Sequence, residues 1–492
     1  MLVLITFFIA LITSILFYVH RKWEEDDAKM GISGPPCLPV LGNILEMKKY
    51  FKDDTANDRY LEFFEKYGDT FRLRLGPKLI IFTRDIKVVE NIVNNPKFKK
   101  SSDYKLYEPW LGDGLLLSHG EKWHKLRKLL TPAFHFEILE RFIPIYEDHG
   151  KIFVDKIRKL GEDKAVSIVP WFHAYTLDVI SESSMGYKLN AQNDPQSKFV
   201  LANKGLLDVT IQRFYFPQYR IDWIWRLTSM YRKEKALIEY FHNFVDEIIT
   251  KRRDFLLSEG ASKQKRPALL DILLQGQVDG QPLSNEVIRA EVNNFMLAGH
   301  ETTGTTLGFL AYILAKNQDV QQKVYEEICE KGLNNTEKSL KIIDLNSLEY
   351  FNTVIKETLR LYPILSGALK ESSEDLRVGK IFVPANTAVC TAIRSIHLNE
   401  KHFDNPREFD PSRWEQETSK EERSPYTYQP FSAGLRNCIG QKFALLELKC
   451  LMVEILREFS MELEDPDFEI DARWGSLGYS KEDIMVKFKA RH

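Results

Sequence analysis

The chain opens with an apolar stretch. Leu2 to Val19 contains no charged residue, and His20, Arg21, Lys22 and Trp23 follow at once. As a helix, these 18 residues would span about 27 Å, close to the hydrocarbon core of a thin bilayer such as that of the endoplasmic reticulum. Basic residues stay on the cytoplasmic side. The pattern therefore predicts a transmembrane anchor over residues 1–20, with the body in the cytosol.

Two other interpretations of this stretch were weighed. A cleaved signal peptide would need basic residues before the apolar core and a small-residue cleavage site after it. Here the basic residues follow the core, and Glu24-Glu25-Asp26-Asp27 comes next, so we favour the anchor. A buried core helix also fits so short a span.

A charged and proline-rich linker is predicted over residues 21–43. Its second half holds Pro35, Pro36 and Pro39, and proline fixes φ and blocks helix continuation. The segment is therefore expected to be a stiff, extended spacer or an ordinary surface linker. The sequence alone fits either interpretation.

The remaining chain has mainly helical periodicity. Thr70 to Leu75 alternates apolar and polar residues, and Leu79 to Thr83 follows the turn at Gly76-Pro77, which predicts a hairpin. A long helix is predicted from about Ser284 to Lys316. No linker divides residues 44–492, so we expect one large domain that is mostly α with a small β-sheet (α+β).

Composition and charge exclude several classes of protein. The chain has 492 residues, of which 44% are hydrophobic, too many for a disordered scaffold. With 68 Lys+Arg against 70 Asp+Glu, the net charge is -2, which argues against a nucleic-acid-binding protein. The five scattered cysteines form no Cys-x-x-Cys pair, so neither a disulfide framework nor a structural zinc site is expected.

The segment from Phe431 to Gly440 concentrates the candidate chemistry. Its sequence is Phe-Ser-Ala-Gly-Leu-Arg-Asn-Cys-Ile-Gly, and a helical pattern follows it. Cys438 would lie just before a helix start, where free N–H groups and the helix dipole stabilise a thiolate, and Arg436 adds positive charge. Gly434 and Gly440 let the backbone approach a ligand closely. A lone cysteine is usually inert core, but this context favours a ligand.

This segment is similar to the haem-binding loop of the cytochrome P-450 superfamily, Phe-x-x-Gly-x-Arg-x-Cys-x-Gly, and every fixed position is present. The resemblance implies the cytochrome P-450 fold and a haem b cofactor. It makes the thiolate of Cys438 the axial ligand of the haem iron, where it favours O–O cleavage. Phe431 and Arg436 belong to the same cofactor-binding loop.

Two further motifs agree with this resemblance. Trp123 and Arg127 resemble the pair that holds a haem propionate in that superfamily. Glu357 and Arg360 resemble its Glu-x-x-Arg motif, and Arg413 resembles the arginine that completes the same buried ion network. Each motif taken alone would be an ordinary helix pair or a loop arginine.

Ala298-Gly299-His300-Glu301-Thr302-Thr303 resembles the oxygen-activation segment of these enzymes. Glycines 299, 304 and 308 weaken the predicted helix, so a local bulge could open there. The resemblance implies that Glu301 as an acid and Thr302 as an alcohol relay protons to bound dioxygen. The alternative is a helix that packs closely through its small residues.

Within the superfamily the chain resembles family four, the fatty-acid omega-hydroxylases and their insect relatives. The residues that carry this likeness are Gly112 to Ser118, Gly120 to Trp123 and Arg127 to Phe136. Three positions depart from the family pattern. Ala298 replaces the glutamate that forms an ester with the haem, so haem is expected without that ester. Asn386 occupies a turn position where glycine is usual, and Lys370 replaces a propionate-binding arginine.

The resemblance implies an NADPH-dependent haem-thiolate monooxygenase that acts on a lipophilic substrate: a fatty acid, a terpenoid or a xenobiotic. No dinucleotide or flavin fingerprint is present, so electrons are expected from NADPH-cytochrome P-450 reductase, and cytochrome b5 is a further partner. Candidate basic contacts for the reductase are Lys125, Lys128 and Lys442. A haem-thiolate isomerase or dehydratase and a haem carrier or sensor are the alternatives, and neither needs the Glu301–Thr302 pair.

Overall fold

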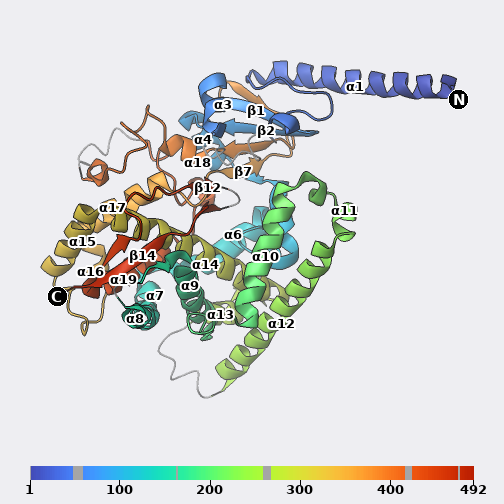
Figure 1. Ribbon diagram of the computed structural model, residues 1–492. Helices are drawn as coiled ribbons and strands as arrows, with labels where there is room; N and C mark the ends of the chain where they lie inside the picture. The colour runs from blue at the N-terminus through green and yellow to red at the C-terminus, as the bar shows by residue number, and fades with distance from the viewer. Residues whose placement is uncertain are drawn as a thin grey trace. The chain divides into compact units, whose positions relative to one another are not determined.

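The structure, a computed structural model, describes residues 2–47, 59–161, 164–258, 268–415, 424–474 and 477–491. Its chain divides into two compact units (Figure 1). The first, here called the sheet unit, comprises Met1–Asp103, Leu365–Glu408 and Ser419–Asn437. The second, the helical unit, comprises Tyr104–Ile364, Phe409–Thr418 and Cys438–His492. Each unit is described by itself, and the predicted boundaries at residues 20 and 43 stay predictions.

The sheet unit is built on a five-stranded sheet with the order β1-β2-β10-β7-β3. Its strands are β1 (Thr70–Leu75), β2 (Lys78–Thr83), β3 (Lys99–Lys100), β7 (Ala368–Glu371) and β10 (Ala388–Thr391), beside the hairpin of β8 (Leu376–Val378) and β9 (Ile381–Val383). Its helices are α1 (Leu2–Met30), α3 (Arg59–Tyr67), α4 (Ile86–Asn94), α18 (Ile393–His397) and the 3-10 turn η7 (Gly434–Arg436). The predicted hairpin is confirmed: β1 and β2 pair antiparallel from Thr70↔Thr83 to Leu75↔Lys78.

The predicted transmembrane anchor is not supported. The apolar stretch runs without interruption into the charged residues after it, as the single helix α1. Within the described residues, no helix combines the length and apolar character needed to cross a membrane. The charged end of α1 is bound to the sheet, because Asp27 forms ion pairs of 2.8 Å with both Arg72 and Arg74 of β1.

The helical unit contains the remaining elements. Its helices are α5 (Glu108–Leu111), α6 (Gly120–Leu130), α7 (Phe136–Glu140), α8 (Ile143–Leu160), α9 (Ile168–Met185), α10 (Lys198–Tyr215), α11 (Asp222–Arg226), α12 (Ser229–Leu257), α13 (Leu269–Gln275), α14 (Asn285–Lys316), α15 (Gln318–Glu330), α16 (Ile342–Asn346), α17 (Glu349–Leu361) and α19 (Gln441–Glu458). Its strands are β4 (Val166–Ser167), β5 (Gln277–Val278), β6 (Gln281–Pro282), β11 (Phe459–Leu463), β12 (Ala472–Trp474), β13 (Gly478–Ser480) and β14 (Met485–Ala490). The short 3-10 turns η1 (Ser102–Tyr107), η2 (Thr131–Phe134), η3 (Pro217–Arg220) and η5 (Pro411–Trp414) connect them.

The long helix α14 forms as the sequence predicts, with Ser284 as its N-cap. It is α-helical throughout, so the bulge expected near Gly299 is not present. A Cβ at Gly299 would lie 2.7 Å from the Ile180 side chain, and one at Gly308 would lie 2.8 Å from Val169. The glycines therefore let α14 lie close against α9, which is the alternative weighed for this segment.

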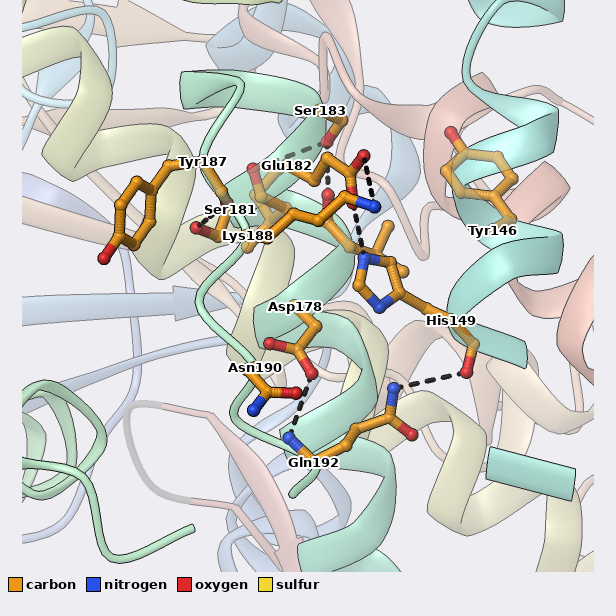
Figure 2. A network of polar contacts seen from close by, with 12 residues as sticks. Tyr146, His149, Asp178, Ser181, Glu182, Ser183, Tyr187, Lys188, Asn190 and Gln192 are labelled. Carbon is orange, nitrogen blue, oxygen red and sulfur yellow. Dashed lines mark hydrogen bonds and ion pairs between the residues drawn. The ribbon is translucent and has the colours of Figure 1, made fainter. Parts of the chain in front are cut away.

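A buried polar network ties α9 to α8 and to the chain that follows α9 (Figure 2). Asp178 of α9 accepts hydrogen bonds from the backbone N–H groups of Ala191 (2.6 Å) and Gln192 (2.9 Å). His149 of α8 lies 2.9 Å from Glu182 of α9 through Nε2, and Figure 2 shows Lys188 beside the same carboxylate. Because buried polar groups are costly unless they are paired, this network fixes the position of α9.

The close approach of α14 and α9 gives a prediction about Gly299→Ala. Alanine normally favours a helix over glycine by up to about 1 kcal/mol. Here the added methyl would overlap the β-branched Ile180 side chain, and overpacking of a core costs about 1–3 kcal/mol. We expect a net loss in the free energy of unfolding, measured by urea denaturation.

Gly205→Ala in α10 is the matched control. Its methyl would meet a methyl of Leu237 at 3.0 Å, with the next atom at 3.8 Å, and that flexible side chain can rotate away. We expect this variant to be as stable as the wild type or more so. A stabilising Gly299→Ala would show that the two helices do not depend on this close packing.

Candidate haem site

Glu357, Arg360 and Arg413 lie together in the helical unit. Glu357 and Arg360 of α17 are fully buried, and Arg360 donates to both carboxylate oxygens of Glu357, at 2.9 and 2.7 Å. Arg413 of η5 donates to Glu357 Oε1 at 3.2 Å. The Trp414 indole (2.9 Å) and the Asp410 backbone N–H (3.1 Å) also donate to this carboxylate. The structure thus brings together the three residues of the predicted ion network, and α17 ends at Leu361, just before Pro363.

Cys438 lies two residues before Gly440, the N-cap of α19. Its side chain is accessible, yet burial among protein atoms raises the pKa of the thiol. A backbone hydrogen bond from Gly440 and the charge of Arg127 lower that pKa, and both effects are smaller than the effect of burial. The backbone N–H and the nearby cation that favour a thiolate are therefore both present, and burial opposes their effect on the pKa of the thiol.

Trp123 and Arg127 lie four residues apart on α6, so both side chains occupy one face of that helix. Trp123 is buried, while Arg127 is half-buried and interacts electrostatically with Cys438. Burial lowers the pKa of Arg127, although a guanidinium stays charged in proteins. The structure therefore places a positive charge close to Cys438, on the helix that carries the predicted propionate-binding pair.

Phe431, Arg436 and Lys370 lie in the sheet unit. Lys370 is buried in β7 and pairs in register with Lys100 of β3. Burial, followed by the charge of Arg436, lowers the pKa of Lys370 to about 8. The same two causes, with Lys370 added, lower the pKa of Lys100 to about 7. Three basic side chains gathered in one place favour an anion there, such as a propionate of a haem.

Lys100 was not predicted from the sequence, because its strand pairing with Lys370 is a long-range contact that local pattern does not reveal. In the cysteine loop, Gly434 has φ +71°, and a Cβ there would lie 2.4 Å from Val93 O, so this position requires glycine. Ser432 also has a positive φ, of 60°. Asn386 adopts φ 60° as expected for its turn.

Ala298 and Thr302 are accessible positions on α14, within a stretch of helix that is otherwise mostly buried. They lie four residues apart and therefore on one face. The Thr302 hydroxyl donates to Ala298 O at 2.6 Å. Ala298 offers no carboxylate to this face, so the ester found in many family-four enzymes has no partner at this position.

Glu301 is directed toward α9, away from the accessible face. Its carboxylate lies 3.0 Å from His300 Nδ1 and 3.5 Å from His173 Nδ1. Burial acts to raise the pKa of Glu301, but His300 and His173 hold it well below its usual range. The structure therefore separates the predicted pair: the alcohol lies on the accessible face, and the acid is bound to two histidines that the sequence analysis did not single out.

The family-four segment from Gly112 to Ser118 also has a structural explanation. A Cβ at Gly114 would lie 2.4 Å from the Asn294 side-chain nitrogen, and the Leu115 backbone N–H donates to both oxygens of Glu291, at 2.9 and 3.2 Å. Burial raises the pKa of Glu291 to about 7. A hollow of about 230 Å³ lies nearby, and its lining includes no predicted site residue.

The residues present fit a haem. Cys438 offers a sulfur atom as the iron ligand. Its side chain is accessible to solvent although many protein atoms lie around it, which suits the binding of a large group. Within the helical unit, Arg127 offers a cation for a propionate. The site residues would thus supply the iron ligand and a counter-charge that this cofactor needs.

The ion network gives a stability prediction. Glu357→Ala would remove the carboxylate that holds two buried arginines, and breaking a buried ion pair in this way costs about 3–5 kcal/mol. We expect that loss in the free energy of unfolding by urea denaturation.

Glu349→Ala, an exposed position on the same helix, is the control and should change stability by less than about 0.5 kcal/mol. If both variants lost the same small amount, the network would not be a stabilising element.

Comparison with known proteins agrees with this geometry. The family model described as "Cytochrome P450" matches residues 32–488. "Cytochrome P450 4d1" of Drosophila melanogaster is 35% identical over 507 residues, which cover 98% of each chain. "Cytochrome P450 4d2" of the same organism is 36% identical over 446 residues, covering 87% of this chain and 88% of the relative.

The fold is also found among solved structures. The crystal structure of the cytochrome P450DA heme domain superposes with a TM-score of 0.81 and 23% sequence identity, over 94% of this chain and 98% of that one. From the family match and these relatives, the chain belongs to the cytochrome P-450 family, resembles its family four, and is a monooxygenase, an oxidoreductase.

Proposed function

We propose that this protein inserts one oxygen atom from dioxygen into a lipophilic substrate (a fatty acid, a terpenoid or a xenobiotic), with Cys438 as the axial haem ligand. The observation that carries the proposal is the Cys438 thiol, which is accessible, densely surrounded and placed beside Arg127. The haem, when bound, supplies the iron centre that activates dioxygen. A thiolate ligand favours cleavage of the O–O bond.

The haem is proposed to be haem b, held without an ester link. Ala298 presents only a methyl group on the accessible face of α14, so the cofactor must be retained by the cysteine and by charge. From the family resemblance, Arg127 with Trp123 would hold a propionate, and Lys370 stands where an arginine often reaches a propionate. Lys370 keeps the positive charge of the usual arginine. Its ammonium group cannot form the paired, coplanar hydrogen bonds that a guanidinium forms with a carboxylate.

Proton delivery is proposed to use Thr302 and Glu301 in a particular order. The Thr302 hydroxyl is the group on the accessible face, and by rotating away from Ala298 O it could donate there. Glu301 cannot reach that face while both histidines hold it. The carboxylate would therefore have to leave the histidines, or act through water, before it could resupply a proton to Thr302.

Electrons are proposed to come from NADPH through NADPH-cytochrome P-450 reductase, with cytochrome b5 as a second partner. Of the three candidate contacts, Lys125 already forms ion pairs with Glu121 (2.7 Å) and Asp279 (2.6 Å). Lys128 and Lys442 are exposed in the same unit and remain the better candidates. A location on the cytosolic face of the endoplasmic reticulum is proposed from the order of apolar and basic residues at the N-terminus.

The test of the proposal is the carbon-monoxide difference spectrum of the reduced, purified protein. We expect a strongly red-shifted Soret band in the wild type and its loss in Cys438→Ser, because the band requires a thiolate ligand. Cys450→Ser is the control, since this cysteine is buried in α19 and should leave the band unchanged. A retained band in Cys438→Ser would remove Cys438 as the ligand.

The reductase contact gives a second prediction. The double variant Lys128→Glu/Lys442→Glu should slow the second-order rate of reduction roughly tenfold at low salt, and the difference should shrink as salt is added, since steering by charge is screened. Stopped-flow reduction with the reductase measures this rate.

Lys204→Glu on α10, also exposed, is the control for a lysine reversal elsewhere in the unit. Equal rates for the double variant and the wild type at low salt would exclude Lys128 and Lys442 as contacts.

A further inference from the structure

His173, His300 and Glu301 form a cluster between α9 and α14. Each contributes one ligand atom, and all these atoms lie within 4.8 Å of one another. Both imidazoles direct Nδ1 toward the Glu301 carboxylate, one to each oxygen, at 3.5 and 3.0 Å. The side chains of His300 and Glu301 are nearly buried, while that of His173 is 22% accessible, which leaves a route for a small ion.

The partners of Glu301 in this cluster are also groups that can bind a metal. The salt bridges that Glu301 forms within the described residues are with His173 and His300, and neutral imidazole nitrogens and carboxylate oxygens are common metal ligands. Glu357 differs, because its partners are arginines, which do not bind metals.

Asn203 adds a fourth polar group. It lies on α10, is buried to 1% exposure, and its Nδ2 is 3.2 Å from His300 Nδ1. Its Oδ1 is buried and has no hydrogen-bond partner. A half-turn of this amide would exchange its nitrogen and oxygen and direct Oδ1, an oxygen ligand, into the cluster.

The groups around the cluster hold it in place. Thr305 Oγ1 lies 3.3 Å from Nε2 of His173, the kind of contact by which metal-binding histidines are usually oriented. Thr176 of α9 donates to His300 O at 3.0 Å. A Cβ at Gly304 would lie 3.0 Å from the His173 ring, so the absence of a side chain there lets this histidine approach α14.

We propose that His173, His300 and Glu301 bind one divalent transition-metal ion of the zinc class, with Asn203 Oδ1 or a water molecule as the fourth ligand. Two imidazoles and one carboxylate suit Zn²⁺, whereas Mg²⁺ and Ca²⁺ prefer oxygen ligands alone. His300 Nδ1 lies 3.0 Å from one oxygen of Glu301 and His173 Nδ1 lies 3.5 Å from the other. Each distance is close to the separation of two ligands around a tetrahedral ion with bonds of about 2.0–2.1 Å. The site does not require haem, so it does not rest on the proposed function.

The first experiment measures binding. Full-length, haem-loaded protein without a histidine tag is treated with a chelator, dialysed against ZnCl₂ and analysed for zinc and iron. We expect one zinc per chain in addition to haem iron. His173→Ala, His300→Ala and Glu301→Gln should each weaken zinc binding by at least about tenfold, since even groups one shell away from a metal contribute 10–100-fold.

His242→Ala is the matched control, because this half-buried histidine of α12 binds Trp110 O and lies outside the cluster. It should bind zinc as the wild type does. Zinc binding that survives all three cluster variants, or no stoichiometric zinc in the wild type, would overturn the proposal. Iron content is measured in the same samples, so loss of haem is distinguished from loss of zinc.

The second experiment avoids substitutions that could unfold the protein. X-ray absorption at the zinc edge of the loaded wild-type protein should show nitrogen and oxygen neighbours at about 2.0–2.1 Å, two of them imidazoles, and no sulfur. Sulfur neighbours, or a shell of oxygen alone, would place the zinc elsewhere and refute the site.

Discussion

Three glycines of α14 let it lie directly against α9, and the candidate chemistry of the helical unit depends on that contact. A side chain at Gly299, Gly304 or Gly308 would meet α9 at 3.0 Å or less, so the helices could not pack as they do. With α9 in place, its histidine reaches Glu301, and the acid turns away from the face that Thr302 occupies. The polar network around Asp178 and His149 fixes α9 from its other side. The three glycines of α14 thus act here by allowing close packing against α9.

Two buried glutamates in this unit show how the choice of partner decides the role of a charge. Glu357 is held by two arginines, a tryptophan and a backbone N–H, all of which are donors at any physiological pH. Its charge is permanently compensated, which suits a structural element. Glu301 is held by two imidazoles, whose charge depends on protons or on a bound ion. A carboxylate whose partners can lose or gain charge can itself exchange a proton or bind a metal ion. A proton relay or a metal site requires this property.

Local pattern predicted the hairpin and the long helix, because alternation and helical periodicity are encoded within a few residues. The motif at Glu357 and Arg360 also indicated its own geometry, since residues three apart share a helix face. Which residues pack against a given helix face or strand depends on the tertiary structure, which local pattern does not encode. His173 lies far from Glu301 in the sequence, and Lys100 joins Lys370 only through strand pairing. For the same reason, the sequence named Arg436 as the cation near the thiol, whereas Arg127 is the one that acts on Cys438 within the helical unit. The apolar N-terminus has the length of a membrane span, but hydropathy alone did not predict that the helix continues to Asp27 and binds the sheet there.

Cys438 and the Glu301 cluster share one electrostatic feature. Burial raises the pKa of the thiol more than Gly440 and Arg127 lower it. The iron of a bound haem would add positive charge at this sulfur, so ligation there would depend on the cofactor. The imidazole–carboxylate cluster would likewise gain positive charge from a bound cation. In both places a bound positive ion would add to the positive charge that the protein's own residues supply. Each site is therefore expected to bind its positive partner more strongly than surface residues of the same types would.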